Sequence, residues 1–276
     1  MTGANAATAA LAKIAVRGLT KVFPLGATEF SALSNVDLDI ADGEFVTVVG
    51  PSGCGKSTLM NVVAGLEEPT SGEVLVDGKP VNGPSPERGV IFQQYALFPW
   101  LTVRKNVEFG LTIAGVGRAE RRRRAEHFID LVGLMDYADQ LPKALSGGMK
   151  QRCAIARAYA ADPTLLLMDE PFGALDALTR VTLQDQLLET WQSEKRTVLF
   201  VTHDVEEAVY LASRVIVMAA RPGRIAEIID VDIPYPRTDE TRLDEHFTAI
   251  KNRVWRAVYH QPPAPARGAS SAGASA

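Results

Sequence analysis

Gly50-Pro51-Ser52-Gly53-Cys54-Gly55-Lys56-Ser57 is the stretch of sequence that decides the fold. An apolar segment at 45–49 precedes it and is predicted to be a strand, and residues 58–64 are predicted to form the helix that follows. Glycines allow backbone N–H groups to wrap a phosphate, and the N-terminus of a helix favours the same anion. A chance glycine-rich turn is a poor explanation in this context, so the stretch indicates a P-loop.

The P-loop predicts a role for each of its residues. Lys56 is expected to reach the β- and γ-phosphates of a nucleotide, and the Ser57 hydroxyl is expected to ligate Mg²⁺. Thr58 is close enough along the chain to donate to a phosphate as well. The predicted phosphate-binding residues are Gly50, Pro51, Ser52, Gly53, Cys54, Gly55, Lys56, Ser57 and Thr58.

A second apolar segment ends in two carboxylates, Leu165-Leu166-Leu167-Met168-Asp169-Glu170. A buried strand would deliver Asp169 to the C-terminal edge of the sheet, where α/β proteins bind ligands, and there it would hold Mg²⁺ through its water shell. Glu170 is predicted to polarise the attacking water. An isolated Asp-Glu pair would indicate only a polar loop, and the P-loop upstream favours the catalytic interpretation.

Between these two motifs lies Leu145-Ser146-Gly147-Gly148-Met149-Lys150-Gln151-Arg152. Ser146 suits the N-cap of a helix, so Ser-Gly-Gly alone would indicate a capped helix start. The whole string in this position is more specific, because it resembles the signature motif of the ATP-binding-cassette (ABC) family. That resemblance implies a head-to-tail homodimer, in which Ser146, Gly147 and Gly148 of one subunit meet the ATP held by the P-loop of the other.

Two more polar positions match the family. Gln93, in Val90-Ile91-Phe92-Gln93-Gln94, corresponds to the glutamine that senses Mg²⁺ and the attacking water, and its place directly after Phe92 favours it over Gln94. His203 corresponds to the histidine that contacts the γ-phosphate. A lone histidine at a strand end is usually structural, so this assignment rests on its spacing from Glu170. The resemblance thus implies Gln93, His203, Glu170 and Lys56 as catalytic residues, and Ser57, Gln93 and Asp169 as the metal site.

Asp176 and Phe23 complete the match. Asp176, in Ala174-Leu175-Asp176, lies in the loop that crosses the dimer interface in the family. Phe23 stands where the family stacks an aromatic ring on adenine, although an aromatic on an N-terminal strand is more often part of the core. The segment 95–100 would line the groove that receives a short helix from a membrane subunit, or would be buried core.

The order of segments predicts an α/β fold with a mainly parallel core sheet, a small antiparallel β-subdomain and a helical subdomain at about 104–160. Apolar strands at 165–168, 198–201 and 215–218 alternate with helical stretches, which indicates a parallel sheet covered on both faces. Short strands separated by turns are expected over 14–40, with another strand at 73–76. The ATPase domain is expected to occupy 13–237.

The two ends of the chain differ from this domain in composition. Residues 1–12 and 261–276 are rich in Ala, Pro, Gly and Ser, and disordered tails are predicted there. A helix is predicted over 238–260 that packs on the domain. Its apolar residues follow helical spacing: Leu243, Phe247, Ile250, Val254, Trp255 and Val258.

Composition limits the classes of function. The chain has 276 residues, 46% hydrophobic and 22% charged, and its net charge of −4 (29 basic against 33 acidic residues) gives no global basic field for nucleic acid. Two cysteines give no disulfide framework, which favours a reducing compartment. Residues 1–12 lack the pattern of a signal peptide, and no apolar run approaches the length of a membrane span.

Several strings are similar to one branch of the family, the bacterial importers of nitrate, sulfonate and taurine. They lie at 171–180, 221–225 and 231–237, and Pro99-Trp100 is also typical of that branch. This resemblance implies a peripheral subunit at the cytoplasmic face of the inner membrane. Its implied partners are two integral membrane permeases and, indirectly, a periplasmic solute-binding protein, with no nucleic acid.

Two other classes of function compete with this one. A non-transport ABC ATPase for DNA repair would carry a coiled-coil or zinc insertion, and one for ribosomes would carry two cassettes; the chain has neither. A cluster-assembly ATPase stays open as an alternative. A P-loop kinase or switch GTPase has no use for the 145–148 string, and the guanine-reading Asn-Lys-x-Asp string is absent.

Overall fold

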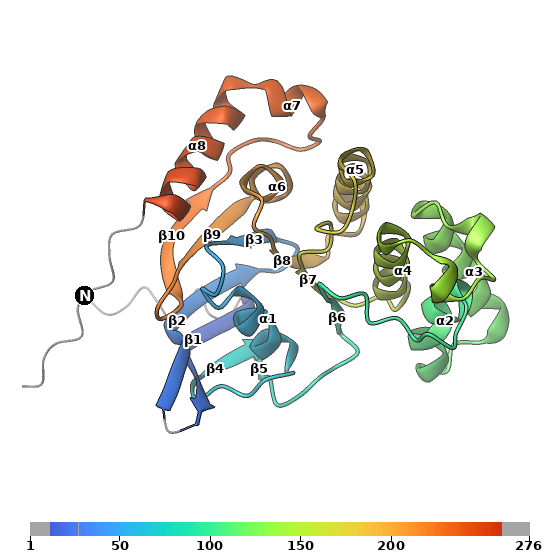
Figure 1. Ribbon diagram of the computed structural model, residues 1–276, viewed down its shortest axis with the longest axis horizontal. Helices are drawn as coiled ribbons and strands as arrows, with labels where there is room; N and C mark the ends of the chain where they lie inside the picture. The colour runs from blue at the N-terminus through green and yellow to red at the C-terminus, as the bar shows by residue number, and fades with distance from the viewer. Residues whose placement is uncertain (1–11, 27, 261–276) are drawn as a thin grey trace, which may run out of the picture.

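The computed structural model describes residues 12–26 and 28–260 (Figure 1). The predicted tails, 1–12 and 261–276, lie outside these residues except for Ala12, which begins the first strand. Among the described residues, every helix is too short or too polar to cross a bilayer.

The core is a six-stranded sheet in the order β10-β9-β3-β8-β7-β6. Five strands are parallel, as predicted, and β10 pairs antiparallel with β9 at the edge. The strands are β3 (Phe45–Val49), β6 (Arg88–Ile91), β7 (Leu165–Asp169), β8 (Thr197–Val201), β9 (Arg214–Ala219) and β10 (Arg224–Asp230). Every residue of β3, β7 and β8 is buried, which explains why these strands are apolar except at Thr47, Asp169 and Thr197.

Two hydrophobic layers enclose this sheet. On one face, Val48 and Leu167 pack with Leu59 of helix α1 (Lys56–Ala64). On the other, Phe200 and Met168 belong to a cluster that includes helices α5 (Ala177–Glu194), α6 (Val205–Leu211) and α8 (Glu245–Tyr259). Helices on both faces are the expected arrangement for parallel strands, because each strand exposes apolar side chains to both sides.

A second, antiparallel sheet in the order β2-β1-β4-β5 covers the α1 side. Its strands are β1 (Ala12–Leu25), β2 (Thr28–Ala41), β4 (Ser71–Val76) and β5 (Lys79–Pro80). The prediction of short strands over 14–40 is wrong, because β1 and β2 run for 14 residues each. Register shifts interrupt their pairing, and Gly18 and Asn35 adopt positive φ inside the strands, which gave the sequence its turn-like breaks.

The helical subdomain stands apart from the sheets at the right of Figure 1. It contains α2 (Val103–Ile113), α3 (Arg118–Leu131) and α4 (Gly147–Ala160), and two short 3-10 turns at Met135–Tyr137 and Pro142–Ala144 lie between α3 and α4. On α3, Arg122 and Arg123 are exposed and pair with Glu126 and Glu120 of the same helix. These two arginines therefore form a solvated face.

The C-terminal region contains two helices in place of the single helix predicted over 238–260. α7 (Asp239–Leu243) ends at Asp244, whose carboxylate accepts from two backbone N–H groups and so caps α8. Phe247, Ile250, Val254 and Val258 are buried as expected. Leu243 and Trp255 are 84% and 47% exposed, so the predicted apolar stripe is wrong at these two positions.

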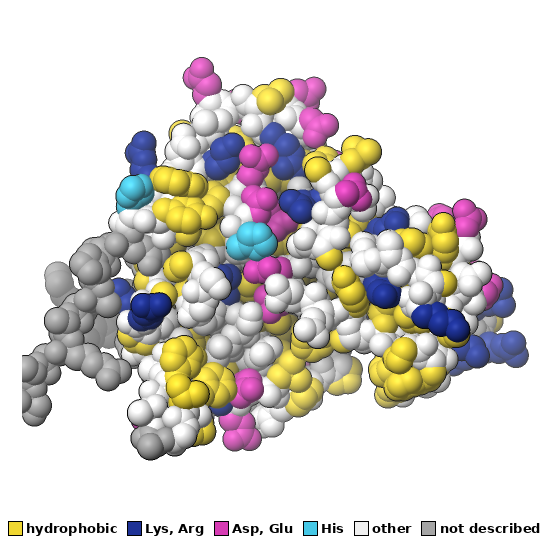
Figure 2. All heavy atoms as spheres, viewed as in Figure 1, with side chains coloured by type: hydrophobic (Ala, Val, Ile, Leu, Met, Phe, Trp, Pro, Cys, Tyr) yellow, Lys and Arg dark blue, Asp and Glu magenta, His cyan; other side chains and the backbone are white. Residues whose placement is uncertain are grey.

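Charges of both signs are mixed on the face that includes α5 to α8 (Figure 2). Several of them form local pairs, such as Lys251 with Glu206 at 3.1 Å and Arg253 with Glu227 at 2.7 Å. Exposed pairs of this kind contribute little to stability. They make this face a mosaic of both signs.

Candidate functional site

A polar cavity of about 480 Å³ opens at the C-terminal end of β3. It brings residues 52–58 of the predicted P-loop together with Gln93, Glu170 and His203, which lie far apart in the sequence, whereas Gly50 and Pro51 are not among its lining residues. Gln94 is not part of it. The lining residues are Phe30, Ala32, Ser52, Gly53, Cys54, Gly55, Lys56, Ser57, Thr58, Gln93, Glu170 and His203.

Close backbone approach makes two P-loop glycines necessary. Gly50 has φ +158°, and a Cβ there would lie 2.6 Å from the Met218 carbonyl oxygen. Gly55 has φ +93°, and its Cβ would lie 2.8 Å from the carbonyl oxygen of Ala32. Gly55 directly precedes the first residue of α1. The loop is therefore wound against β2 and β9 in a form that only glycine allows.

Lys56 is folded back into its own loop. Its side chain is buried, and Nζ donates to the carbonyl oxygens of Gly50 at 2.9 Å and Pro51 at 3.3 Å. The neighbouring Cys54 is a free, buried thiol whose pKa is raised by burial. A positive charge with fixed donors thus lies at the centre of the loop, where phosphates would be expected.

Ser57 lines the cavity, whereas the buried Asp169 is not among its lining residues. Burial raises the pKa of Asp169, and a hydrogen bond with Ser57 and the charge of Lys56 oppose that rise. A bound cation would favour the ionised form of this desolvated carboxyl group. A carboxylate, a hydroxyl and an open cavity for water fit Mg²⁺, which prefers oxygen ligands and keeps several waters.

The Glu170 carboxylate contacts two of the other predicted catalytic side chains. Its Oε2 atom accepts from Nε2 of Gln93 at 3.1 Å and lies 3.1 Å from Nδ1 of His203. The Glu170 backbone has φ +46°, and its N–H donates to the Val201 carbonyl oxygen at 2.9 Å. This unusual backbone conformation turns the carboxylate from the end of β7 into the cavity.

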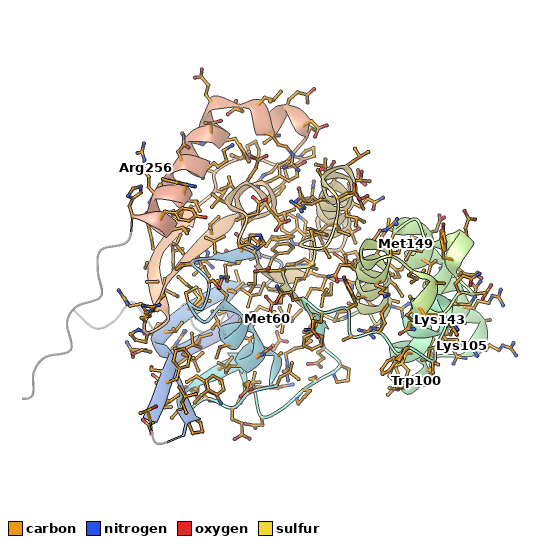
Figure 3. The ribbon with its side chains drawn as sticks, viewed as in Figure 1. Met60, Trp100, Lys105, Lys143, Met149 and Arg256 are labelled. Carbon is orange, nitrogen blue, oxygen red and sulfur yellow. The ribbon has the colours of Figure 1, made fainter. Side chains whose placement is uncertain are left out.

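The signature residues lie elsewhere. Ser146 is the exposed N-cap of α4, and its Oγ accepts from the Met149 N–H at 3.3 Å. Ser146, Gly147 and Gly148 are not among the cavity's lining residues. Figure 3 shows Met149 of α4 and Met60 of α1 in separate parts of the molecule.

Two neighbours explain why glycines follow Ser146. A Cβ on Gly147 would lie 2.9 Å from the Tyr95 hydroxyl oxygen, and one on Gly148 would lie 3.2 Å from Leu175. The start of α4 is therefore packed closely against the segment after Gln93 and the segment before Asp176. Asp176 itself caps α5, accepting from the Thr179 N–H at 3.0 Å, and it also lies outside the cavity.

The aromatic residue in the cavity is Phe30, which sequence reasoning missed. Phe30 is 49% exposed and pairs directly with Phe23 across β1 and β2, so the two side chains share one face. Phe23 does not line the cavity, and the ammonium of Lys21 lies 4.7 Å from its ring centroid. Strand register, which the sequence does not reveal, is the signal that identifies Phe30.

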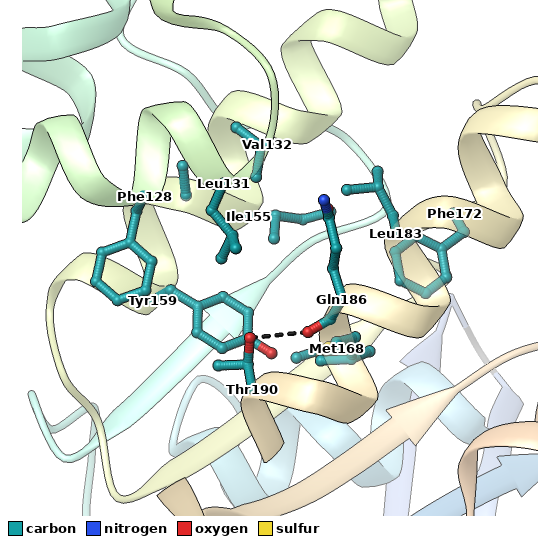
Figure 4. A pocket seen from close by; sticks show the side chains of 12 residues that line it. Phe128, Leu131, Val132, Ile155, Tyr159, Met168, Phe172, Leu183, Gln186 and Thr190 are labelled. Atoms are coloured by element: carbon teal, nitrogen blue, oxygen red, sulfur yellow. Dashed lines mark hydrogen bonds between the residues drawn. The ribbon is translucent and has the colours of Figure 1, made fainter. Parts of the chain in front are cut away.

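A second cavity, of about 20 Å³, lies between the helical subdomain and α5 (Figure 4). Its lining is almost entirely apolar, and Tyr159 points its ring into it from α4. The cavity has room for about one water molecule. It is a packing gap between the two parts of the chain, and it has none of the charged groups that a nucleotide would need.

The fold and the polar cavity define a P-loop ATPase with a signature helix. A family model described as ABC transporter matches residues 33–173, and the chain belongs to this family. An ATP-binding protein of Brucella abortus is 73% identical over 234 residues, covering 85% of this chain and 90% of that protein. The chain is thus an ATP-hydrolysing subunit of the ABC type.

Other relatives carry more specific names. The nitrate import ATP-binding protein of Synechocystis sp. is 49% identical, covering 79% of this chain and 82% of that protein. The aliphatic sulfonates import ATP-binding protein of Bacillus cereus is 43% identical, covering 87% and 94%. Among solved structures, the dimeric ATP-binding cassette MJ0796 with ADP and Pi is 35% identical, with a TM-score of 0.72, covering 80% of this chain and all of that one.

Proposed function

We propose that this chain hydrolyses MgATP in a head-to-tail homodimer and drives a bacterial importer for a small anion of the nitrate, sulfonate or taurine type. The observation that supports a site shared between two subunits is that the P-loop residues and the signature residues are separated within one chain. The P-loop, Gln93, Glu170 and His203 share one cavity, whereas Ser146 is exposed outside it. A second copy of the chain would bring its own Ser146, Gly147, Gly148 and Asp176 to that cavity.

The chemistry follows from the side chains of the cavity. Water attacks the γ-phosphorus in line with the bridging oxygen, whose bond breaks with its electron pair on ADP. Glu170 Oε2 receives the proton of that water, and Gln93 and His203 hold the carboxylate and the γ-phosphate in place. Lys56 neutralises phosphate charge. Ser57, Gln93 and Asp169 would hold Mg²⁺, which when bound shields the phosphate oxygens.

The adenine would lie on the face that Phe23 and Phe30 share. Phe30 presents an exposed ring to the cavity. Stacking on an aromatic ring recognises a base through its flat face and its apolar surface. This proposal retains Phe23 as an adenine contact and adds Phe30 beside it.

Import is supported by the names of the relatives and by an exposed aromatic surface. The relatives named above import nitrate and aliphatic sulfonates, which are both small anions. Trp100 is 72% exposed and lies against Phe98, which contacts Phe109 at a ring distance of 4.3 Å. We assign this surface to one of two integral membrane permeases, which receive solute from a periplasmic binding protein. The chain would then be peripheral at the cytoplasmic face.

Purification of the full chain from its natural membrane tests this proposal. Recovery with a multi-span membrane protein, reduced by the substitution Trp100→Asp, is the expected result. Recovery with a purely soluble partner would instead favour the alternative, a non-transport ABC ATPase such as one for cluster assembly. Leu243→Asp is a matched control, because Leu243 is 84% exposed and lies on the distant helix α7.

A further inference from the structure

A buried carboxylate lies behind His203. Glu207, on α6, is 5% exposed, and together with Glu170, His203 and Thr202 it lines a gap of about 30 Å³ behind the catalytic cavity. Burial of a carboxylate is costly unless its oxygens are hydrogen-bonded. Glu207 does not line the P-loop cavity and is shielded from solvent, so its charge needs another explanation.

Both oxygens of Glu207 accept hydrogen bonds from buried side chains. Oε2 accepts from the Thr202 hydroxyl, and Oε1 accepts from Nε2 of Gln184, on α5, at 2.9 Å. The other end of the Gln184 amide accepts from the guanidinium of Arg242, on α7, at 2.8 Å. Thr202, Glu207, Gln184 and Arg242 form a continuous chain of contacts, which we call the Glu207 relay.

The direction of each bond in the relay follows from its donors when Glu207 is ionised. Arginine has no acceptor, so the Gln184 oxygen must face Arg242 and its nitrogen must face Glu207. The Thr202 oxygen accepts from the Asp204 N–H at 3.0 Å, and the Thr202 hydroxyl donates to Glu207, because an ionised carboxylate has no proton to give. Donors therefore approach from both ends. A carboxylate at the middle position accepts on both sides and so satisfies both donors.

The relay fixes the backbone on both sides of His203. Thr202 directly precedes this histidine, and its N–H donates to the Val48 carbonyl oxygen at 3.1 Å. Through its hydroxyl, Thr202 also holds Asp204, the residue that follows. The imidazole itself is 66% exposed. Its position 3.1 Å from Glu170 Oε2 thus depends on a backbone that is held from behind.

We propose that Glu207 is a positioning residue for His203, and that Gln184 and Arg242 connect Glu207 to the C-terminal helix α7. The inference rests on the proposed role of His203. Burial raises the pKa of Glu207, and the charge of Asp204 adds to that rise. The hydrogen bonds from Thr202 and Gln184 and the charge of Arg180 oppose it. The guanidinium of Arg242 lies 3.4 Å from the Tyr210 ring centroid, which anchors the far end of the relay.

The substitution Glu207→Gln tests the inference. An amide can accept at only one end, so Thr202 or Gln184 would face a second donor. We expect kcat for ATP hydrolysis to fall about tenfold or more, with KM for ATP changed less than about twofold. If Glu207 were needed only for folding, the substitution would lower the fraction of active protein and the melting temperature. The value of kcat per active site, with the sites counted by titration, would then equal that of the original chain.

A double substitution, Glu207→Gln with Gln184→Glu, provides the rescue. The carboxylate now at position 184 would accept from Arg242 and from the amide nitrogen at position 207, and the amide oxygen at position 207 would accept from Thr202. All bonds of the relay are restored with the charge moved by one position. We expect kcat within about threefold of the original chain. Failure of the double variant to recover, at an unchanged melting temperature, would overturn the relay.

Three further variants separate the possible outcomes. Glu189→Gln changes the charge of an exposed residue on the same helix as Gln184 and is expected to leave kcat unchanged. Arg242→Met should lower kcat by a smaller factor than Glu207→Gln, at constant KM; an unchanged kcat would remove α7 from the proposal. If His203→Ala abolishes turnover while Glu207→Gln does not, the relay alone is wrong. If His203→Ala has no effect, the proposed site itself is wrong.

Discussion

The P-loop face and the signature end of α4 are opposite in construction. At the P-loop face, Lys56, Gln93, Glu170 and His203 bond to one another or to the loop, and their atoms converge on one cavity. At the signature end, Ser146 is exposed, and its Oγ accepts from the Met149 N–H of its own helix turn. One region gathers the residues proposed for catalysis, and the other presents an exposed hydroxyl at the start of a helix. The difference supports the proposed head-to-tail dimer, in which each chain would contribute two unlike halves to two shared sites.

Glu170→Gln is the most severe way to break the P-loop half. The amide cannot accept a proton from water, so turnover should fall by about 10²- to 10⁴-fold. Glutamine and glutamate side chains have nearly the same size, so ATP binding and ATP-dependent dimerisation should persist. Phosphate release measures the first effect, and size-exclusion chromatography with ATP measures the second. Turnover equal to the original chain would refute the role of Glu170 as the base.

Mixing two defective subunits tests the unlike halves directly. Lys56→Ala removes the P-loop cation and Ser146→Ala removes the signature hydroxyl, and each variant alone should lose most of its turnover. In an equal mixture, half of the dimers pair the two variants, and one of their two sites is intact. About a quarter of the original activity should return if the sites act independently. No recovery would show that Ser146 acts on its own chain's nucleotide.

The parts of the site that lie in local motifs could be predicted from the sequence. The P-loop and the Asp169-Glu170 strand each combine a buried strand with polar residues at its C-terminal end, so their spacing is enough. β10 was not predicted, because this edge strand of 7 residues has a charged residue at every third position and so shows neither a continuous apolar run nor a strict alternation. The helix break at Asp244 is hidden because the apolar spacing continues across it from Leu243 to Phe247.

Residues that depend on tertiary contacts could not be predicted. Phe30 faces the cavity only because β1 and β2 pair with Phe23 opposite it, and this register includes several shifts. Glu207 follows Glu206 in the first turn of α6, where acidic residues are ordinary partners of the helix dipole. Its burial depends on Gln184, which lies 23 residues earlier. No local pattern in the sequence connects these side chains.

The adenine end of the P-loop half can be weakened separately from its chemistry. Phe30→Ala removes the exposed ring that lines the cavity, and loss of one stacking contact should raise KM for ATP about tenfold. The γ-phosphate contacts are unaffected, so kcat should change less than about twofold. Phe30→Leu separates stacking from apolar contact and should give an intermediate KM. If Phe23→Ala raises KM and Phe30→Ala does not, the base stacks on Phe23 alone.

Two capping aspartates separate the signature half from ordinary helix stability. Asp176 caps α5 beside the signature end, and Asp244 caps α8 far from it. Substitution of either by alanine removes an N-cap, and each should lower the melting temperature by about 2–4 °C at neutral pH. Only Asp176→Ala should also lower turnover, because only Asp176 is expected at the dimer interface.

Acid distinguishes the cap of Asp176 from its interface role. The hydrogen bond from the Thr179 N–H lowers the pKa of Asp176 below its ordinary value. A carboxylate with a lowered folded pKa stabilises the protein above its unfolded pKa, and this stabilisation is lost as pH falls through the folded value. The difference in melting temperature between Asp176→Ala and the original chain should therefore be largest near neutral pH and shrink in acid. Asp244→Ala with the same loss of turnover at neutral pH would mean that helix stability, and not the interface, limits hydrolysis.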